Sequence, residues 1–215
     1  LDAMEGTVIG VGTKRRQQGR RRRPWRQVVG WVFVVSSPSG GGKTTVVRRL
    51  LGMDRTLMRS VSVTTRSPRR GEHAGQDYRF VSPVAFEQMR RARRLLEWAR
   101  VHGALYGTPE PPIRRALARG RDVILSLDVQ GARQVRHRLG GRAVLLFLLP
   151  RSMLELRRRL IQRGTDSPEA IRRRLREARA EMACARWYDY AIVNDRLDET
   201  VRRLQAVIVA QHCRV

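Results

Sequence analysis

Residues 31–51 read WVFVVSSPSGGGKTTVVRRLL and carry the strongest structural signal in this chain. Residues 31–36 are almost entirely apolar and rich in β-branched and aromatic types, so they predict a buried β-strand. The stretch VVRRLL, which follows the loop, places apolar side chains at helical spacing. We therefore expect a strand, a glycine-rich loop and a helix in direct succession.

The loop SPSGGGKTT at residues 37–45 has the character of a phosphate site. Consecutive glycines allow positive φ angles, so several backbone N–H groups can converge on one anion at a helix N-terminus. In the pattern GxxxxGK[ST] the lysine reaches the β- and γ-phosphates and the hydroxyl ligates Mg²⁺. Ser37 stands at the first position of that pattern, but the spacing of the rest is intact. The residues predicted to bind the nucleoside triphosphate are Ser39, Gly40, Gly41, Gly42, Lys43, Thr44 and Thr45.

Further apolar strands are predicted at 122–129, 143–150 and 190–195, separated by helix-length segments. Apolar strands that alternate with amphipathic helices indicate an α/β fold, with a parallel sheet covered on both faces. Residues 60–108 interrupt this alternation and are predicted to be an inserted subdomain. Asp128, at the end of an apolar strand, is expected near the metal.

The chain of 215 residues carries 45 Lys and Arg against 19 Asp and Glu, a formal charge of +26. Its hydrophobic share of 41% is that of an ordinary globular domain. Only Lys14 and Lys43 are lysines, so the excess looks like an arginine-favouring codon bias, and aromatic residues are few. We expect no specific nucleic-acid binding. Because lysine is so rare here, Lys43 within a glycine run indicates a functional requirement.

The apolar runs at 28–35 and 143–149 are too short to cross a bilayer. A secretory signal ending in the first run is disfavoured, because cleavage there would cut into the glycine-rich loop. Because the apolar runs are short, we expect no membrane association. Cys184 and Cys213 have neither the spacing of a disulfide framework nor that of a zinc site, so we expect a reducing, cytoplasmic location. Residues 1–27 are predicted to be a flexible basic extension and 28–215 the folded domain.

Over about residues 31–212 the chain resembles the guanylate kinases. The likeness rests on motifs in the right order, SPSGGGKTT, SVSVTTRSPRRGEHAGQDYRFVS, LEWARVHGALYGTP, ILSLDVQGA, LRRRLIQRGTDS, IRRRL and IVND. It implies a P-loop kinase with a central parallel five-stranded sheet flanked by helices. It also implies a mixed α/β GMP-binding subdomain at 60–108 and a small helical lid at 157–172. The implied reaction transfers the γ-phosphoryl group of ATP to GMP, and to dGMP, with Mg²⁺.

The resemblance also implies how GMP is held. Arg66, Arg69, Tyr78 and Tyr106 match the family's phosphate-binding positions, and guanidinium forks suit a dianionic phosphate. Glu97 matches the carboxylate that accepts guanine's two adjacent N–H donors, which adenine lacks.

Ser62 and Thr108 match hydroxyl positions that contact the base. Asp128 is expected at the GMP site as well as near the metal, through water. The family usually has an acid two residues before Asp128, whereas this chain has Ser126, so we expect weaker affinity or altered water structure rather than lost activity.

The GMP phosphate is already ionised at neutral pH, so no general base is needed, and catalysis rests on positioning and charge neutralisation. Arg159, Arg163 and Arg174 match the family's lid arginines, and Asn194 matches an adenine-side position. The residues expected to be catalytic are Lys43, Arg66, Arg159, Arg163 and Arg174. We expect hinge motion of residues 60–108 and of the lid.

Three alternatives remain open at this point. The first is an inactive scaffold of the same fold that binds a phosphorylated partner, although such scaffolds typically lack a working phosphate loop. The second is a nucleic-acid binder that relies on the basic extension, and the third is a kinase for another nucleoside monophosphate. Either a monomer or a homodimer is compatible with the sequence.

Overall fold

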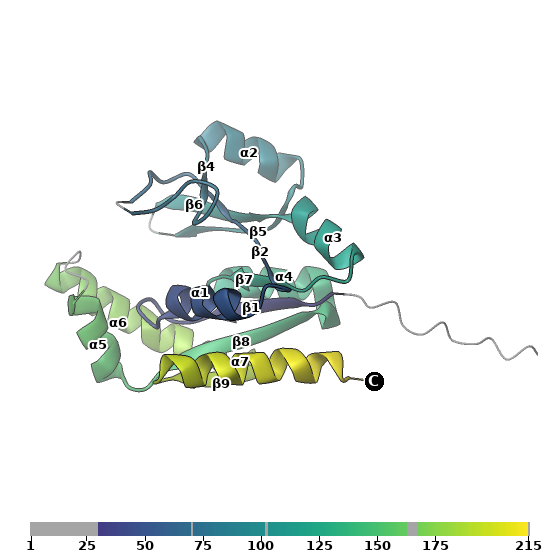
Figure 1. Cartoon of the computed structure of the whole chain (residues 1–215). Helices are drawn as coiled ribbons and strands as arrows, with labels where there is room; N and C mark the ends of the chain where they lie inside the picture. The colour runs from purple at the N-terminus through teal and green to yellow at the C-terminus, as the bar shows by residue number, and fades with distance from the viewer. Residues whose placement is uncertain (1–29, 70, 102, 163–166, 215) are drawn as a thin grey trace, which may run out of the picture.

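The computed structural model describes residues 30–69, 71–101, 103–162 and 167–214. The predicted basic extension at 1–27 lies outside these residues. The core is a five-stranded sheet of β1 (Val32–Ser36), β2 (Met58–Arg59), β7 (Val123–Ser126), β8 (Ala143–Pro150) and β9 (Tyr190–Asn194). The strands run parallel in the order β2-β7-β1-β8-β9 (Figure 1). This confirms the five-stranded parallel sheet, and its short edge strand β2 is the one that the sequence pattern did not reveal.

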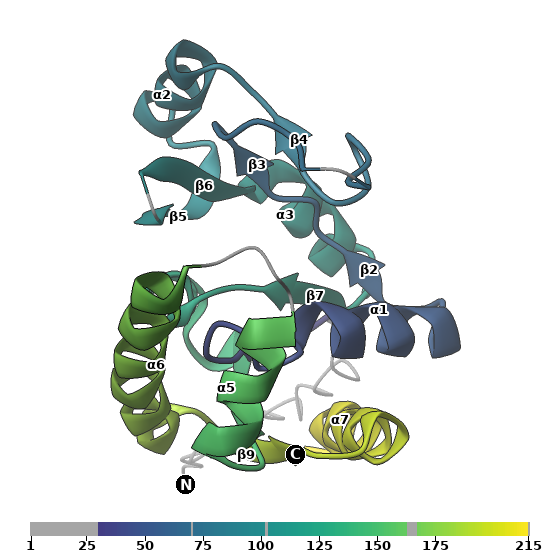
Figure 2. The same cartoon turned by 90° about the vertical axis from the view of Figure 1, so that its left-hand side faces the viewer.

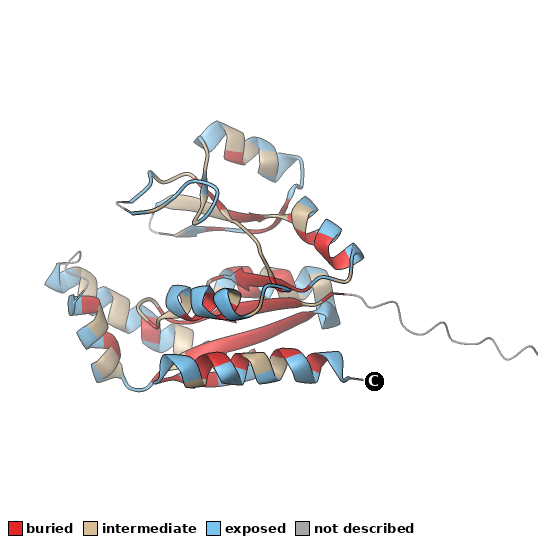
Figure 3. Ribbon diagram, in the orientation of Figure 1, coloured by how far each residue is buried: buried red, intermediate tan, exposed pale blue. Residues whose placement is uncertain are grey.

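Helices cover both faces of this sheet, as the apolar strands require. α3 (Glu110–Ala118) and α4 (Val129–Leu139) pack on one face, and α1 (Lys43–Met53) and α7 (Leu197–His212) pack on the other. Successive residues of a strand point to opposite faces, so Val34 joins the first core and Phe33 the second. Burial is concentrated on the strands and on the inward faces of these helices (Figure 3).

A second, four-stranded sheet is inserted after β2. Its strands are β3 (Val63–Thr64), β4 (Arg79–Phe80), β5 (Leu95–Val101) and β6 (Ala104–Pro109), in the order β4-β3-β6-β5. α2 (Pro83–Arg91) packs on this sheet through Phe86, which contacts Val63 and Leu95 in a small core of its own. In Figure 1 this layer lies above the main sheet, and its strands extend one residue beyond the segment predicted to be the subdomain.

α5 (Met153–Gln162) and α6 (Pro168–Ala183) form a helical pair beside the main sheet (Figure 2). They pack through Leu156, Leu160 and Ala178. Cys184–Trp187 continue from α6 as a 3₁₀ turn, and a similar turn, Gly140–Arg142, precedes β8. The predicted lid at 157–172 includes the second half of α5 and the first turn of α6, and its residues 163–166 lie outside the described residues. None of the described helices is long and apolar enough to span a membrane.

The parallel arrangement fixes where a ligand can bind. The carboxyl ends of β1, β7, β8 and β9 lie at one edge of the main sheet, where open α/β folds bind their ligands. The loop after β1, the residues after β7 and the residue that ends β9 therefore meet at that edge.

Candidate active site

The loop between β1 and α1 is a tight turn that depends on glycine. Gly40 and Gly42 both have φ +88°, and Gly42 is the left-handed N-cap of α1. A Cβ on Gly42 would lie 2.6 Å from the Asn194 Nδ2 atom, so no larger residue fits there without a shift. The Gly41 N–H closes the turn on the Pro38 carbonyl at 2.8 Å. This turn leads directly into the N-terminus of α1, as the sequence predicts for a phosphate cradle.

Asn194, at the end of β9, holds this loop from within the protein. Its side chain is buried, and its Nδ2 donates to the Gly41 carbonyl at 2.8 Å. Its Oδ1 accepts a hydrogen bond from the Thr200 hydroxyl at 3.1 Å. The sequence places Asn194 at the adenine side, and its contacts in the structure are with the loop itself.

Lys43 begins α1 and bridges two strand ends. Its Nζ donates to the Leu127 carbonyl at 2.7 Å, just beyond the end of β7. Burial of the ammonium lowers the pKa of Lys43, and the nearby carboxylates of Asp128, Glu181 and Glu97 oppose that shift. Thr44, which follows it, is exposed on the first turn of the helix.

Asp128 lies where β7 passes into α4. It caps that helix, with its Oδ1 accepting the Gly131 N–H at 2.8 Å. Ser126, the last residue of β7, is exposed. Asp128 and Thr44 thus follow the neighbouring strands β7 and β1 at the same edge of the sheet.

Glu97 is a buried acid on β5. The Thr108 hydroxyl on β6 donates to its Oε1 at 2.5 Å, and the Ser62 hydroxyl lies 3.5 Å from that of Thr108. Burial raises the pKa of Glu97 to about 7, with a smaller upward contribution from Asp128, while the Thr108 hydrogen bond and Lys43 oppose the rise. The other carboxylate oxygen faces α4, since a Cβ on Gly131 would lie 2.8 Å from it. The three residues expected at the base therefore form one connected group.

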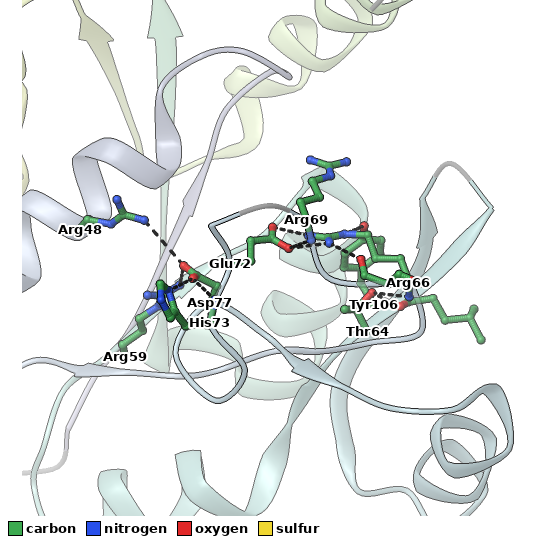
Figure 4. Close-up of polar contacts among 11 residues, drawn as sticks. Arg48, Arg59, Thr64, Arg66, Arg69, Glu72, His73, Asp77 and Tyr106 are labelled. Carbon is green, nitrogen blue, oxygen red and sulfur yellow. Dashed lines mark hydrogen bonds and ion pairs between the residues drawn. The ribbon is translucent and has the colours of Figure 1, made fainter. Parts of the chain in front are cut away.

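Arg66 is the centre of a second polar cluster, shown in Figure 4. Its Nε donates to the Tyr106 hydroxyl at 3.0 Å, and its Nη1 and Nη2 donate to the two Glu72 oxygens at 2.7 and 2.6 Å. Its guanidinium also lies 5.0 Å from the centre of the Tyr78 ring. The paired Glu72 carboxylate raises the pKa of Arg66 above its usual range, and Arg66 lowers the pKa of Glu72.

Glu72 is a residue that the sequence analysis missed. It accepts the Arg69 backbone N–H at 2.9 Å as well as the Arg66 fork, so it fixes the loop that carries both arginines. The Arg69 side chain is exposed and extends from this loop (Figure 4). The available signal was an acid three residues after Arg69 in a chain where acids are scarce.

A cavity of about 680 Å³ joins the two sheets. The predicted site residues that line it come from α1, the loops around β3 and β4, the main sheet and α6, namely Thr44, Ser62, Arg66, Arg69, Tyr78, Ser126 and Arg174. Glu97 adjoins this cavity through Thr108 and Ser62. Another cavity, of about 520 Å³ and lined by α3 residues, contains none of the predicted site residues.

The helical pair contributes further charges. Arg159 on α5 is paired with Glu155 at 2.9 Å, and its Nη1 lies 3.6 Å from where a Gly42 Cβ would be, so it faces the phosphate loop. Arg163 lies outside the described residues. Glu181 on α6 was also missed from the sequence; burial raises its pKa, and the Ser39 backbone N–H and the Lys43 ammonium oppose the rise.

Comparisons with known proteins agree with this arrangement. A family model described as guanylate kinase matches residues 30–211. A guanylate kinase of Geobacter sulfurreducens is 48% identical over 185 residues, which is 86% of this chain and 91% of the relative. One of Dechloromonas aromatica is 50% identical over 183 residues, covering 85% and 90%. The crystal structure of guanylate kinase from Anaplasma phagocytophilum superposes with a TM-score of 0.74 at 33% identity, covering 88% of this chain and 89% of that one.

Proposed function

This chain belongs to the guanylate kinase family, and from that premise we propose that its cavity binds GMP while the loop at residues 37–45 holds the phosphates of ATP. The protein is a nucleoside-monophosphate kinase that transfers the γ-phosphoryl group of ATP to GMP, giving ADP and GDP. The observation that carries the site assignment is the cavity itself. It is lined together by Thr44 of α1, Arg66 of the loop after β3 and Arg174 of α6.

Guanine selection is assigned to Glu97. Its carboxylate, when ionised, accepts guanine's ring N–H and exocyclic amino group together, whereas adenine offers no such pair of donors. Buried polar groups left unpaired by the wrong base cost binding energy, so the site discriminates strongly. Thr108 holds the carboxylate and Ser62 extends the same group toward the cavity.

The GMP phosphate is assigned to Arg66, with Arg69, Tyr78 and Tyr106 around it. The Glu72 carboxylate fixes the Arg66 guanidinium at the wall of the cavity, so its positive charge lies beside a phosphate that enters there. A phosphate oxygen of GMP then attacks the γ-phosphorus, a new P–O bond forms, and the bond to the β,γ-bridging oxygen of ATP breaks. Arg159 and Arg174 face this region, and with Lys43 they neutralise charge on the transferred group. Arg163 is assigned the same role on the resemblance alone.

Mg²⁺ fits the residues at the ends of β1 and β7. The Thr44 hydroxyl is exposed at the cavity, and Asp128 uses one oxygen for its helix cap, which leaves the other for a metal-bound water. When bound with ATP, the ion supplies positive charge to the β- and γ-phosphates. Asn194 shapes the loop that receives these phosphates.

The inactive-scaffold alternative is not supported, because the phosphate loop is intact and the relatives are named as kinases. Each copy of the chain carries the whole proposed site, so a monomer and a homodimer are both competent. Cys184 and Cys213 are free thiols, which suits a reducing compartment such as the cytoplasm.

The proposal is tested by measuring ADP release from ATP with GMP, dGMP, AMP and UMP side by side. We expect GMP and dGMP to be used and AMP and UMP to be used poorly. Equal use of AMP would refute the role of Glu97. A crystal structure with nucleotide bound would show directly which base lies beside that residue.

A further inference from the structure

The strand that carries Glu97 is the edge strand of its sheet. β5 pairs with β6 on one side and ends the strand order on the other. An edge strand presents backbone N–H and C=O groups that need partners from elsewhere. α4, a helix that packs on the main sheet, contacts β5. Side chains of α4 that bind the free edge of β5 therefore connect the main sheet with the inserted sheet.

Gln134 on α4 supplies those partners at Trp98. Its Oε1 accepts the Trp98 N–H at 3.2 Å, and its Nε2 donates to the Trp98 carbonyl at 2.7 Å. A primary amide offers an acceptor and a donor side by side, as a neighbouring strand does, so Gln134 extends the hydrogen bonding of the sheet by one unit. Trp98 directly follows Glu97, so the two hydrogen bonds from Gln134 restrain the backbone next to Glu97.

Arg138 provides a second attachment on the same helix face. It lies four residues after Gln134, one turn further along α4. Its Nη1 donates to the Leu95 carbonyl at 2.9 Å and lies 3.2 Å from the Glu110 Oε2 atom. α4 therefore holds β5 on both sides of Glu97, at Leu95 and at Trp98.

The first turn of the same helix faces the carboxylate. Gly131 leaves no space for a side chain beside the Glu97 Oε2 atom, and its N–H is bonded to Asp128. Small movements of β5 along α4 would therefore carry the carboxylate away from Gly131 and Asp128. A displacement of about 1 Å at a binding group is enough to lose much of its effect.

We propose that Gln134 is a positioning residue for guanine selection, because its paired hydrogen bonds to Trp98 hold the Glu97 carboxylate in place against α4. The inference rests on the function proposed above. Gln134 does not line the cavity, and its contacts with β5 are with the strand backbone, so its effect reaches the base only through Glu97.

The test compares Gln134→Met, which keeps the length of the side chain and removes both hydrogen bonds, with His137→Met, a control on an exposed position of the same helix. We expect Gln134→Met to raise KM for GMP about tenfold and to lower the preference for GMP over AMP by a similar factor. KM for ATP should stay within about twofold, because the phosphate loop is untouched. His137→Met should match the parent in all three quantities.

Gln134→Glu is the conservative variant. It keeps the length of the side chain and the acceptor for the Trp98 N–H, but it places a carboxylate oxygen against the Trp98 carbonyl to which the amide donates, so its KM for GMP should rise at least as far as that of Gln134→Met. If Gln134→Met does not fold, this variant decides the question by the same comparison.

An unchanged KM for GMP, or equal losses on the GMP and ATP sides, would overturn the inference, since equal losses indicate a general structural role. Failure of the proposed function would be visible in the parent protein, as absent GMP turnover or equal use of AMP, before any variant is compared.

Discussion

Lys43 is a rare lysine held at the start of α1. The chain uses lysine at two of its 45 basic positions, and this one stands at the loop that follows the central strand. Its ammonium is bonded to the Leu127 carbonyl and taken out of solvent, which lowers its pKa. In that place the charge is poorly screened, so it acts strongly on a phosphate that enters the loop.

We predict that Lys43→Ala lowers kcat about 10²- to 10³-fold, the usual cost of losing one fixed positive donor in the transition state. Steady-state kinetics with GMP measures this. Arg49→Ala is the control, because Arg49 is exposed on the same helix and pairs with Asp198 at 3.2 Å. A turnover equal to that of the parent would contradict the assignment of Lys43.

Glu97 is an acid whose ionised form is costly at its buried position. Its pKa of about 7, raised mainly by burial from 4.5, means that the folded protein holds a proton there that the unfolded chain releases above pH 4.5. Its contribution to stability is therefore fully present below pH 4.5 and is lost as the pH rises through 7. At pH 8 this costs up to about 3 kcal/mol.

We predict that Glu97→Gln raises the melting temperature at pH 8 and has little effect at pH 4.5, because the amide carries no buried charge. Thermal unfolding across this pH range measures the effect. A melting temperature that falls at pH 8 would show that the Thr108 hydrogen bond outweighs desolvation.

The same variant should weaken GMP use at least tenfold in kcat/KM and leave KM for ATP nearly unchanged. The affinity of the parent protein for guanosine should fall as the pH drops below about 7, because a protonated Glu97 is a poor acceptor for the two guanine N–H donors. Glu97→Gln should lack this pH dependence. Guanosine is the probe because it has no phosphate to titrate. A comparable loss on the ATP side would point to a folding defect instead.

At the scale of elements, the glycine loop and α1 form one unit in which two glycines have opposite requirements. Gly42 has φ +88° and no space for a Cβ against Asn194. At Gly52, near the other end of α1, a Cβ would meet no other atom within 4 Å. The first position therefore requires glycine, and the second accepts a side chain.

We predict that Gly42→Ala destabilises the protein by about 1–3 kcal/mol and abolishes ATP binding, because the loop must shift. Gly52→Ala should stabilise it by up to about 1 kcal/mol, since alanine favours the helix. Denaturant unfolding and ATP titration measure both. Wild-type ATP affinity in Gly42→Ala would contradict the cradle geometry.

At the scale of the whole molecule, two sheets face a common cavity and arginines from several elements surround it. With a formal charge of +26, the protein attracts two anionic substrates over distances set by the ionic strength.

We predict that kcat/KM for GMP falls several-fold between about 0.05 M and about 0.5 M salt, with a smaller change in kcat. Guanosine binding is the control, because without a phosphate it should be nearly independent of salt. Equal salt dependence for guanosine and GMP would exclude electrostatic attraction of the phosphate as the cause.

The strand, loop and helix at 31–51 and the parallel sheet could be predicted from the sequence, because apolar runs, glycine spacing and helical periodicity are local properties of the chain. It did not reveal β2, whose two residues are too few to form a pattern. Motif resemblance named Glu97, Thr108 and Ser62. Only the tertiary structure showed that these residues form one bonded group, that Glu72 occupies the Arg66 fork, and that Gln134 holds the edge of β5. Those contacts join segments that are far apart in the chain or depend on the direction of side chains. They form only after the segments have packed together, so a local sequence pattern does not reveal them.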